Sequence, residues 1–156
     1  FDPRRNVVRL SQDVYYGSSI TSVSVAAHEC GHAIQYATGY NFLTFRSALF
    51  PVVNFSSSIS WFLITIGFMF SRGPFLEIGI LLFSASVLFQ LVTLPVEFNA
   101  SHRAIAQITD MGIISKNEVG KSKKVLTAAA LTYVAAALTS ILELVRLFLI
   151  ANNNED

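Results

Sequence analysis

Two histidines with a glutamate between them form the most chemically specific pattern in the chain, His28-Glu29-Cys30-Gly31-His32. On a helix this spacing is about one turn, so both imidazole rings project from the same face. Two imidazoles placed in this way can hold one Zn²⁺ ion. Glu29 is rotated away from the ligand pair, where it could act as a general base toward water. Cys30 lies on the opposite, apolar side of the helix and is predicted to pack in the core.

A catalytic zinc site usually has three protein ligands and one open position, so a third ligand must lie elsewhere in the chain. The candidates after the motif are Glu97, His102 and Asp110. If residues 95–104 are helical, Glu97 and Ser101 share one side, whereas His102 points about 140° away from Glu97. The predicted zinc ligands are therefore the two histidines and Glu97, a gluzincin-like set.

These residues predict a mechanism for the hydrolysis of peptide bonds. Glu29 takes a proton from the attacking water and passes it to the leaving amine. The zinc ion draws electron density from the reacting oxygens. Arg103 and His102 are candidates to stabilise the oxyanion, with Ser101 as a further polar neighbour. The alternative interpretation of this pair is a membrane-edge arginine and a surface histidine.

Local signals place the motif on a helix. Gly17-Ser18-Ser19 is a helix-start signal with a serine as cap, and Gly39 is a good stop after Thr38. The apolar face predicted for this helix consists of Ile20, Val23, Ala27, Cys30 and Ile34. Upstream, residues 6–10 predict a short strand whose edge could bind an extended substrate.

The composition is that of a protein in contact with lipid. Of 156 residues, 53% are hydrophobic and 13% are charged, whereas soluble domains carry about 25% charged residues. The single cysteine excludes an internal disulfide. A net charge of +1 without a basic patch gives no indication of nucleic acid binding.

Three apolar stretches, residues 48–70, 75–96 and 125–150, are each long enough to cross a bilayer. Ser71-Arg72-Gly73-Pro74 is a turn signal between the first two. We therefore predict an all-α membrane protein with about three transmembrane helices, a zincin-like motif helix and a short N-terminal strand. A soluble helical bundle is the alternative.

The spans predict one membrane-embedded domain, residues 1–156, in four parts. These are the motif segment 1–45, a transmembrane hairpin 46–96, a third-ligand helix and loop 97–124, and a transmembrane helix 125–150. Two spans separate the histidines from Glu97, so the ligands are predicted to share one membrane face. All of the 11 lysines and arginines except Arg72 and Arg146 fall on that face, which the positive-inside rule makes cytoplasmic.

Several short motifs resemble one known family. They are Asp2-Pro3-Arg4, Val8-Arg9-Leu10-Ser11, Ala26-Ala27-His28-Glu29, Gly31-His32-Ala33-Ile34-Gln35, Glu97-Phe98-Asn99-Ala100-Ser101, Lys123-Lys124-Val125-Leu126 and the run Ala128-Ala129-Ala130-Leu131-Thr132-Tyr133-Val134-Ala135-Ala136. Over nearly the whole chain they resemble the YugP-type bacterial neutral zinc metallopeptidases. The resemblance implies a multi-pass protein of the bacterial cell membrane with a His-Glu-x-x-His zinc site, and a membrane segment before Phe1.

The arrangement is also similar to the wider group of HtpX and CAAX-prenyl membrane proteases. In that group an acidic residue one turn after the glutamate ligand orients a zinc histidine. Ser101 occupies that position here, and a serine is a weaker acceptor than a carboxylate.

Two other classes of protein fit parts of the pattern. A non-enzymatic membrane scaffold or channel-associated protein could hold a structural metal, but it needs no base beside an open coordination position. A transporter predicts ionisable residues at mid-membrane, whereas Glu77, Glu143 and Arg146 lie near span ends. The expected partners are a protein or peptide substrate and the lipid bilayer. The sequence leaves the substrate and any oligomerisation open.

Overall fold

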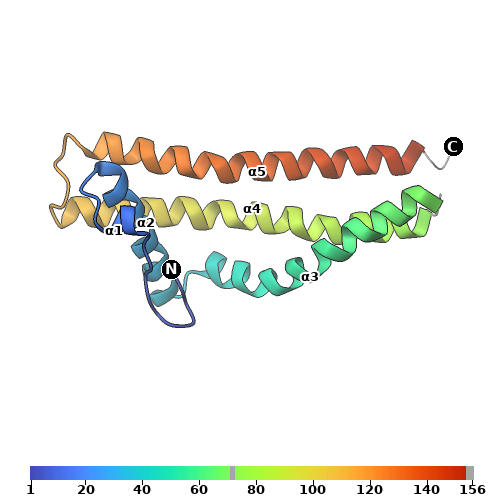
Figure 1. Ribbon diagram of the computed structural model, residues 1–156, viewed down its shortest axis with the longest axis horizontal. Coiled ribbons are helices and arrows are strands. Elements are labelled where there is room, and N and C mark those ends of the chain that lie inside the picture. The colour runs from blue at the N-terminus through green and yellow to red at the C-terminus, as the bar shows by residue number, and fades with distance from the viewer. Residues whose placement is uncertain (71–72, 154–156) are drawn as a thin grey trace. The chain divides into compact units, whose positions relative to one another are not determined.

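The computed structural model describes residues 1–70 and 73–153, which form helices joined by short connections (Figure 1). In chain order these are α1 (Gln12–Tyr15), α2 (Ile20–Ala37), α3 (Asn41–Phe70), α4 (Gly73–Asp110) and α5 (Val119–Asn153). The predicted all-α class is confirmed. The predicted turn at Ser71 and Arg72 lies outside the described residues, as do residues 154–156.

The short strand predicted at residues 6–10 is wrong. In the described part of the chain the strand-like pairing is an isolated bridge, in which the backbones of Asp2 and Val7 exchange hydrogen bonds of 2.9 and 3.3 Å. The Asp2 carboxylate also accepts hydrogen bonds from the amides of Arg4 and Arg5. Such side-chain turns compete with extended structure. They curl the segment back on itself, and the edge predicted to bind substrate is not formed.

The helix that carries the motif, α2, has both of its predicted ends. The Ser19 hydroxyl caps its start by accepting a 3.1 Å hydrogen bond from the Ser22 amide. At its end Gly39 takes a positive φ of 62°, and the Tyr40 amide donates to the Gln35 carbonyl at 2.9 Å. This pairing is the Schellman arrangement that glycine allows. It returns Tyr40 to the side of the helix on which Gln35 lies.

Helices α3, α4 and α5 are each long and apolar enough to cross a bilayer. In their most apolar 18-residue windows only 17%, 33% and 11% of the residues are buried. A soluble bundle would turn such side chains toward a core, whereas lipid solvates them without cost. The membrane class is therefore favoured over the soluble alternative. Helix α4 also runs unbroken through Pro95, so one helix carries both the apolar span and Glu97.

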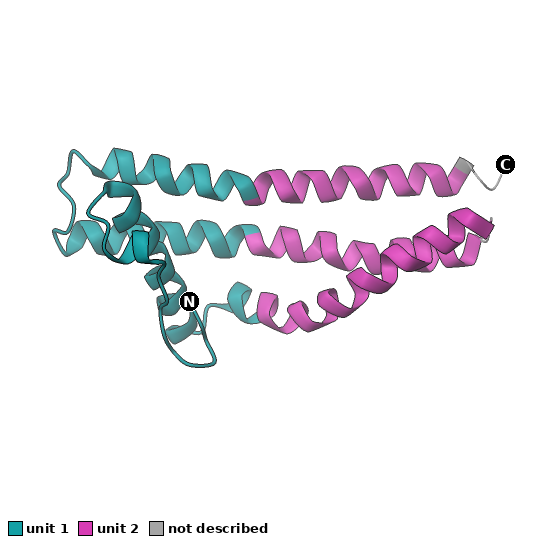
Figure 2. Cartoon of the chain, in the orientation of Figure 1, with its two compact units in different colours: residues 1–44, 94–132 teal, residues 45–93, 133–156 magenta. Residues whose placement is uncertain are grey.

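The chain divides into two compact units (Figure 2). The first comprises residues 1–44 and 94–132, and the second residues 45–93 and 133–156. In the second unit the Ser60 hydroxyl donates to the Gly79 carbonyl at 2.8 Å, and a side chain at Gly79 would collide with Ile64. Small residues thus let α3 and α4 pack closely, as is usual for helices in lipid.

The first unit has its own core, to which α2, α4 and α5 all contribute. Its buried members are Ala27, Ala104, Ile108, Ile114 and Leu126. A buried hydrogen bond of 2.7 Å between the hydroxyls of Ser24 and Ser122 joins α2 to α5. These contacts hold the motif helix against the end of α4 that carries Glu97.

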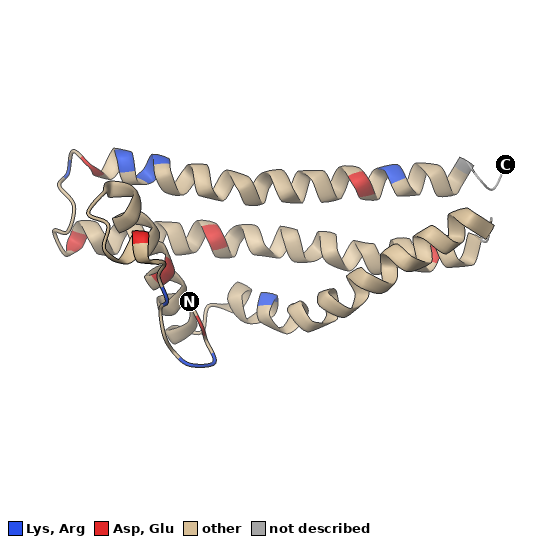
Figure 3. Ribbon diagram, viewed as in Figure 1, with Lys and Arg blue, Asp and Glu red and all other residues tan. Residues whose placement is uncertain are grey.

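Charged side chains are concentrated in the first unit (Figure 3). The described part of the second unit has only Arg46, Glu77, Glu143 and Arg146. Arg146 lies 3.2 Å from the Glu143 carboxylate, and Arg46 donates to the Thr93 hydroxyl at 3.2 Å. Because unpaired charges are costly in lipid, this distribution fits a second unit that lies within the bilayer.

Candidate metal centre

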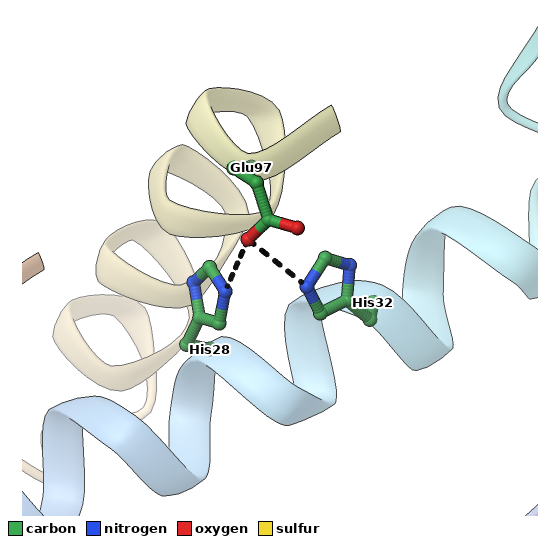
Figure 4. Close-up of side chains that lie close together, drawn as sticks. All are labelled: His28, His32 and Glu97. Atoms are coloured by element: carbon green, nitrogen blue, oxygen red, sulfur yellow. Dashed lines mark hydrogen bonds and ion pairs between the residues drawn. The ribbon is translucent and has the colours of Figure 1, made fainter. Parts of the chain in front are cut away.

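Three side chains converge on one point in the first unit (Figure 4). His28 and His32 come from α2, and Glu97 comes from α4. The Nε2 atom of His28 lies 3.2 Å from Glu97 Oε2, and that of His32 lies 3.5 Å from the same oxygen. Ligand atoms of all three residues lie within 4.8 Å of one another. The structure therefore brings together three residues that could hold a metal ion.

The electrostatics of the centre favour a bound cation. Glu97 is only 2% exposed, whereas the side chains of His28 and His32 are 16% and 14% exposed. A buried carboxylate is destabilising unless a positive charge compensates it, and neutral imidazoles carry no full charge. A divalent cation between the three residues would provide that compensation. The partly exposed histidine rings leave the centre accessible.

The residues fit zinc in both type and spacing. Two imidazole nitrogens and one carboxylate oxygen are the three-ligand set of a catalytic zinc site. Atoms about 2.0–2.1 Å from zinc at tetrahedral angles lie roughly 3.3 Å apart. The observed nitrogen–oxygen separations of 3.2 and 3.5 Å are close to that value. Zinc is therefore the cofactor that this centre could hold.

The ring nitrogens that point away from Glu97 also have partners. His28 Nδ1 lies 3.1 Å from the Ser101 hydroxyl, and His32 Nδ1 lies 3.0 Å from Gln35 Oε1. Such partners hold a ligand ring in its orientation. Ser101 was predicted from the sequence as a polar neighbour of the site, whereas Gln35 was not. The available signal was its spacing, because a residue three positions after His32 lies on the same helix face.

Glu29 lies next to the centre without belonging to it. Its carboxylate contacts the backbone nitrogen of Phe1, and its side chain is 29% exposed. The Phe1 ring packs against Tyr36, with ring centroids 5.7 Å apart. Among the described residues the metal-capable cluster contains the two histidines and Glu97 but not Glu29. Glu29 thus follows a candidate ligand directly in the sequence and is partly open to solvent, which is compatible with its predicted role as a general base.

The other predicted candidates lie outside the cluster formed by the described residues. His102 and Asp110 are both exposed. Arg103 is engaged by its neighbours, because its Nε donates to Asn99 Oδ1 at 2.8 Å. Its guanidinium carbon also lies 5.8 Å from the centroid of the Tyr40 ring. Arg103 therefore contacts residues around the centre.

The prediction that Cys30 packs in the core is wrong, because Cys30 is exposed. Helix α2 is instead buried along Ser24, Ala27, Gly31 and Gln35. These residues are small or hydrogen-bonded, and their face is rotated from the predicted apolar one. Cys30 lines a surface pocket of about 420 Å³ with apolar side chains from α2 and α4. The thiol is not part of the metal-capable cluster found in the described chain.

Gly31 allows the backbones of α2 and α4 to touch. A Cβ atom at this position would collide with the carbonyl oxygen of Ala100 and lie 3.2 Å from its Cα. Ala100 is itself fully buried, at 0% exposure. The absence of a side chain at Gly31 thus brings the backbone of the histidines next to the backbone of Glu97.

We expect Gly31→Ala to destabilise the protein by about 1–3 kcal/mol, the usual range for overpacking, and to weaken zinc binding by separating the ligands. Thermal unfolding in detergent and zinc titration measure the two effects. Gly120→Ala is the matched control, because a Cβ there meets nothing within 4 Å. A Gly31→Ala protein as stable as the Gly120→Ala protein would contradict the close-packing argument.

The comparisons with known proteins agree with this centre. A family model described as "Putative neutral zinc metallopeptidase" matches residues 1–152. The chain is 53% identical over 156 residues to "Putative membrane protease YugP" of Bacillus subtilis (strain 168), covering 100% of this chain and 69% of that protein. No solved structure matches the chain. Because the family model covers nearly all of its length, the chain belongs to this family of neutral zinc metallopeptidases.

Proposed function

We propose that this protein is a membrane-embedded zinc endopeptidase that hydrolyses peptide bonds of protein substrates at the cytoplasmic face of a bacterial membrane. The observation that carries the proposal is the convergence of His28, His32 and Glu97 within 4.8 Å, with Glu29 beside them. The family match and the relative named as a membrane protease support it.

In this proposal each residue of the centre has one task. His28 and His32 would hold zinc through Nε2, and Glu97 would hold it through its carboxylate. The zinc ion, when bound, acts as a Lewis acid toward the reacting oxygens. The Glu29 carboxylate accepts a proton from the attacking water and then donates it to the nitrogen of the leaving amine. Ser101 holds the His28 ring in place.

The cytoplasmic orientation rests on charge. The first unit contains the metal centre and eight lysines and arginines, namely Arg4, Arg5, Arg9, Arg103, Lys116, Lys121, Lys123 and Lys124. Loops rich in lysine and arginine stay on the cytoplasmic side of bacterial membranes. We therefore propose that the centre faces the cytoplasm and that the protein crosses the cell membrane several times.

The number of ligands argues against a membrane scaffold with a structural metal. Structural zinc sites almost always have four protein ligands, whereas the cluster in residues 1–70 and 73–153 offers three. Three protein ligands leave one coordination position for water and substrate. A general base such as Glu29, next to a ligand in the sequence, would have no purpose in a structural site.

Removal of the metal tests the proposal. We expect 1,10-phenanthroline to abolish peptide hydrolysis by the purified full-length protein in detergent, and added zinc to restore it, because zinc supplies the Lewis acid. The isomer 1,7-phenanthroline, which does not chelate, is the matched control. Full hydrolysis by protein shown to be free of metal would contradict the proposed function.

A further inference from the structure

Gln35 connects the two helices of the metal centre. It is fully buried, at 0% exposure. Its Oε1 lies 3.0 Å from His32 Nδ1. Its Nε2 donates to the Val96 carbonyl at 2.8 Å and to Asn99 Oδ1 at 3.0 Å. Since a side-chain amide has two N–H donors, both of its hydrogens are used.

The direction of these hydrogen bonds follows from groups that can only donate or only accept. Arg103 Nε can only donate, so the Asn99 atom 2.8 Å from it is the oxygen. That oxygen and the Val96 carbonyl can only accept, so the Gln35 nitrogen faces them. The Gln35 oxygen then faces His32, whose Nδ1 must carry a hydrogen. In the neutral ring the lone pair is therefore on Nε2, the atom that faces the metal centre.

The Nδ1 atom of His28 has no such constraint. It lies 3.1 Å from the Ser101 hydroxyl, and a hydroxyl can both donate and accept. Ser101 is therefore compatible with either tautomer of His28. The two histidines thus differ at Nδ1, because only the partner of His32 requires this nitrogen to carry a hydrogen.

Arg103, the last residue of the hydrogen-bond chain that starts at His32, is also held in place. The Arg103 guanidinium lies 5.8 Å from the centroid of the Tyr40 ring, within the range of a cation–π contact. Tyr40 is in turn fixed by the 2.9 Å hydrogen bond from its amide to the Gln35 carbonyl. The turn at Gly39 thus also holds the backbone of Gln35.

We propose that Gln35, held by Asn99 and Arg103, is a positioning residue that sets the tautomer of His32 before zinc binds. The inference rests on the proposed role of His32 as a zinc ligand. Without Gln35, the neutral ring would place its hydrogen on Nε2, where the Glu97 carboxylate can accept it. Zinc would then have to displace that hydrogen, so its affinity would fall.

Nitrogen NMR of metal-free, full-length protein with ¹⁵N-labelled histidine tests this inference. The chain has 3 histidines, so His32 can be assigned from single substitutions. In the wild type, recorded at a pH at which the His32 ring is neutral, we expect its hydrogen on Nδ1. In Gln35→Met we expect the hydrogen on Nε2, together with zinc affinity about 10–100-fold weaker in a chelator competition assay. Asn99→Asp is the matched control, because a carboxylate still accepts from Gln35 and Arg103, and the wild-type tautomer should persist.

Each outcome decides the inference. A metal-free wild type with the hydrogen of His32 on Nε2 would overturn it without any variant, even if Gln35→Met fails to fold. A Gln35→Met protein that loses thermal stability but keeps the wild-type tautomer and zinc affinity would overturn it as well. A protein with the expected tautomer and affinity that cleaves no peptide would support the inference while contradicting the proposed function.

Discussion

Glu29→Gln is expected to lower the rate of peptide hydrolysis by about 10²–10⁴-fold, the usual contribution of a general base. Glutamine has nearly the same shape as glutamate, but it cannot accept a proton from water. Zinc should stay bound, because Glu29 lies outside the three-residue cluster of the described chain. Initial rates on a peptide substrate and the zinc content of the same preparations measure both effects.

The control for this prediction replaces a carboxylate by an amide at a position away from the centre. Glu77 is exposed on α4 in the second unit, so Glu77→Gln should retain wild-type hydrolysis. A Glu29→Gln protein that cleaves at the wild-type rate would contradict the assigned mechanism. It would leave a structural metal site as the better explanation of the histidine pair.

Glu97→Gln is expected to weaken zinc binding by more than about 100-fold, beyond the effect of losing an outer hydrogen-bond partner. The substitution removes the carboxylate of the three-residue cluster but leaves the volume of the side chain nearly unchanged. The metal-free protein should still fold, because a neutral amide is less costly to bury than a carboxylate. A competition titration with a chromophoric chelator gives the change in zinc affinity.

The matched controls for Glu97→Gln are the two other candidates for the third ligand. His102 and Asp110 are exposed, so His102→Gln and Asp110→Asn should bind zinc as the wild type does. If either control loses zinc while Glu97→Gln keeps it, the assignment of Glu97 as the third ligand is wrong.

The parts of the fold that depend on local chemistry were predictable from the sequence. The cap at Ser19 and the left-handed Gly39 define α2, because each acts within one helical turn. The pairing of Glu97 with the histidines was also predictable, since two intervening spans return the chain to its starting side. Apolar length alone identified the three membrane helices.

The parts that depend on how helices pack were not predictable in the same way. Periodicity favoured a buried face containing Cys30, but α2 turns its small residues inward because Gly31 meets Ala100. That contact also places Gln35 between His32 and Asn99. The predicted strand at residues 6–10 did not form for a different reason. The Asp2 side chain stabilises a turn just before it, and this turn outweighs the β-propensity of residues 6–10.

We propose that His28, His32 and Glu97 hold one zinc ion with nitrogen and oxygen ligands. Zinc K-edge X-ray absorption of the purified full-length protein tests it most directly. We expect about one zinc per chain, surrounded by nitrogen and oxygen at about 2.0–2.1 Å with the scattering of two imidazoles. A sulfur neighbour at about 2.3 Å, which would implicate Cys30, or a protein that retains no zinc, would contradict it.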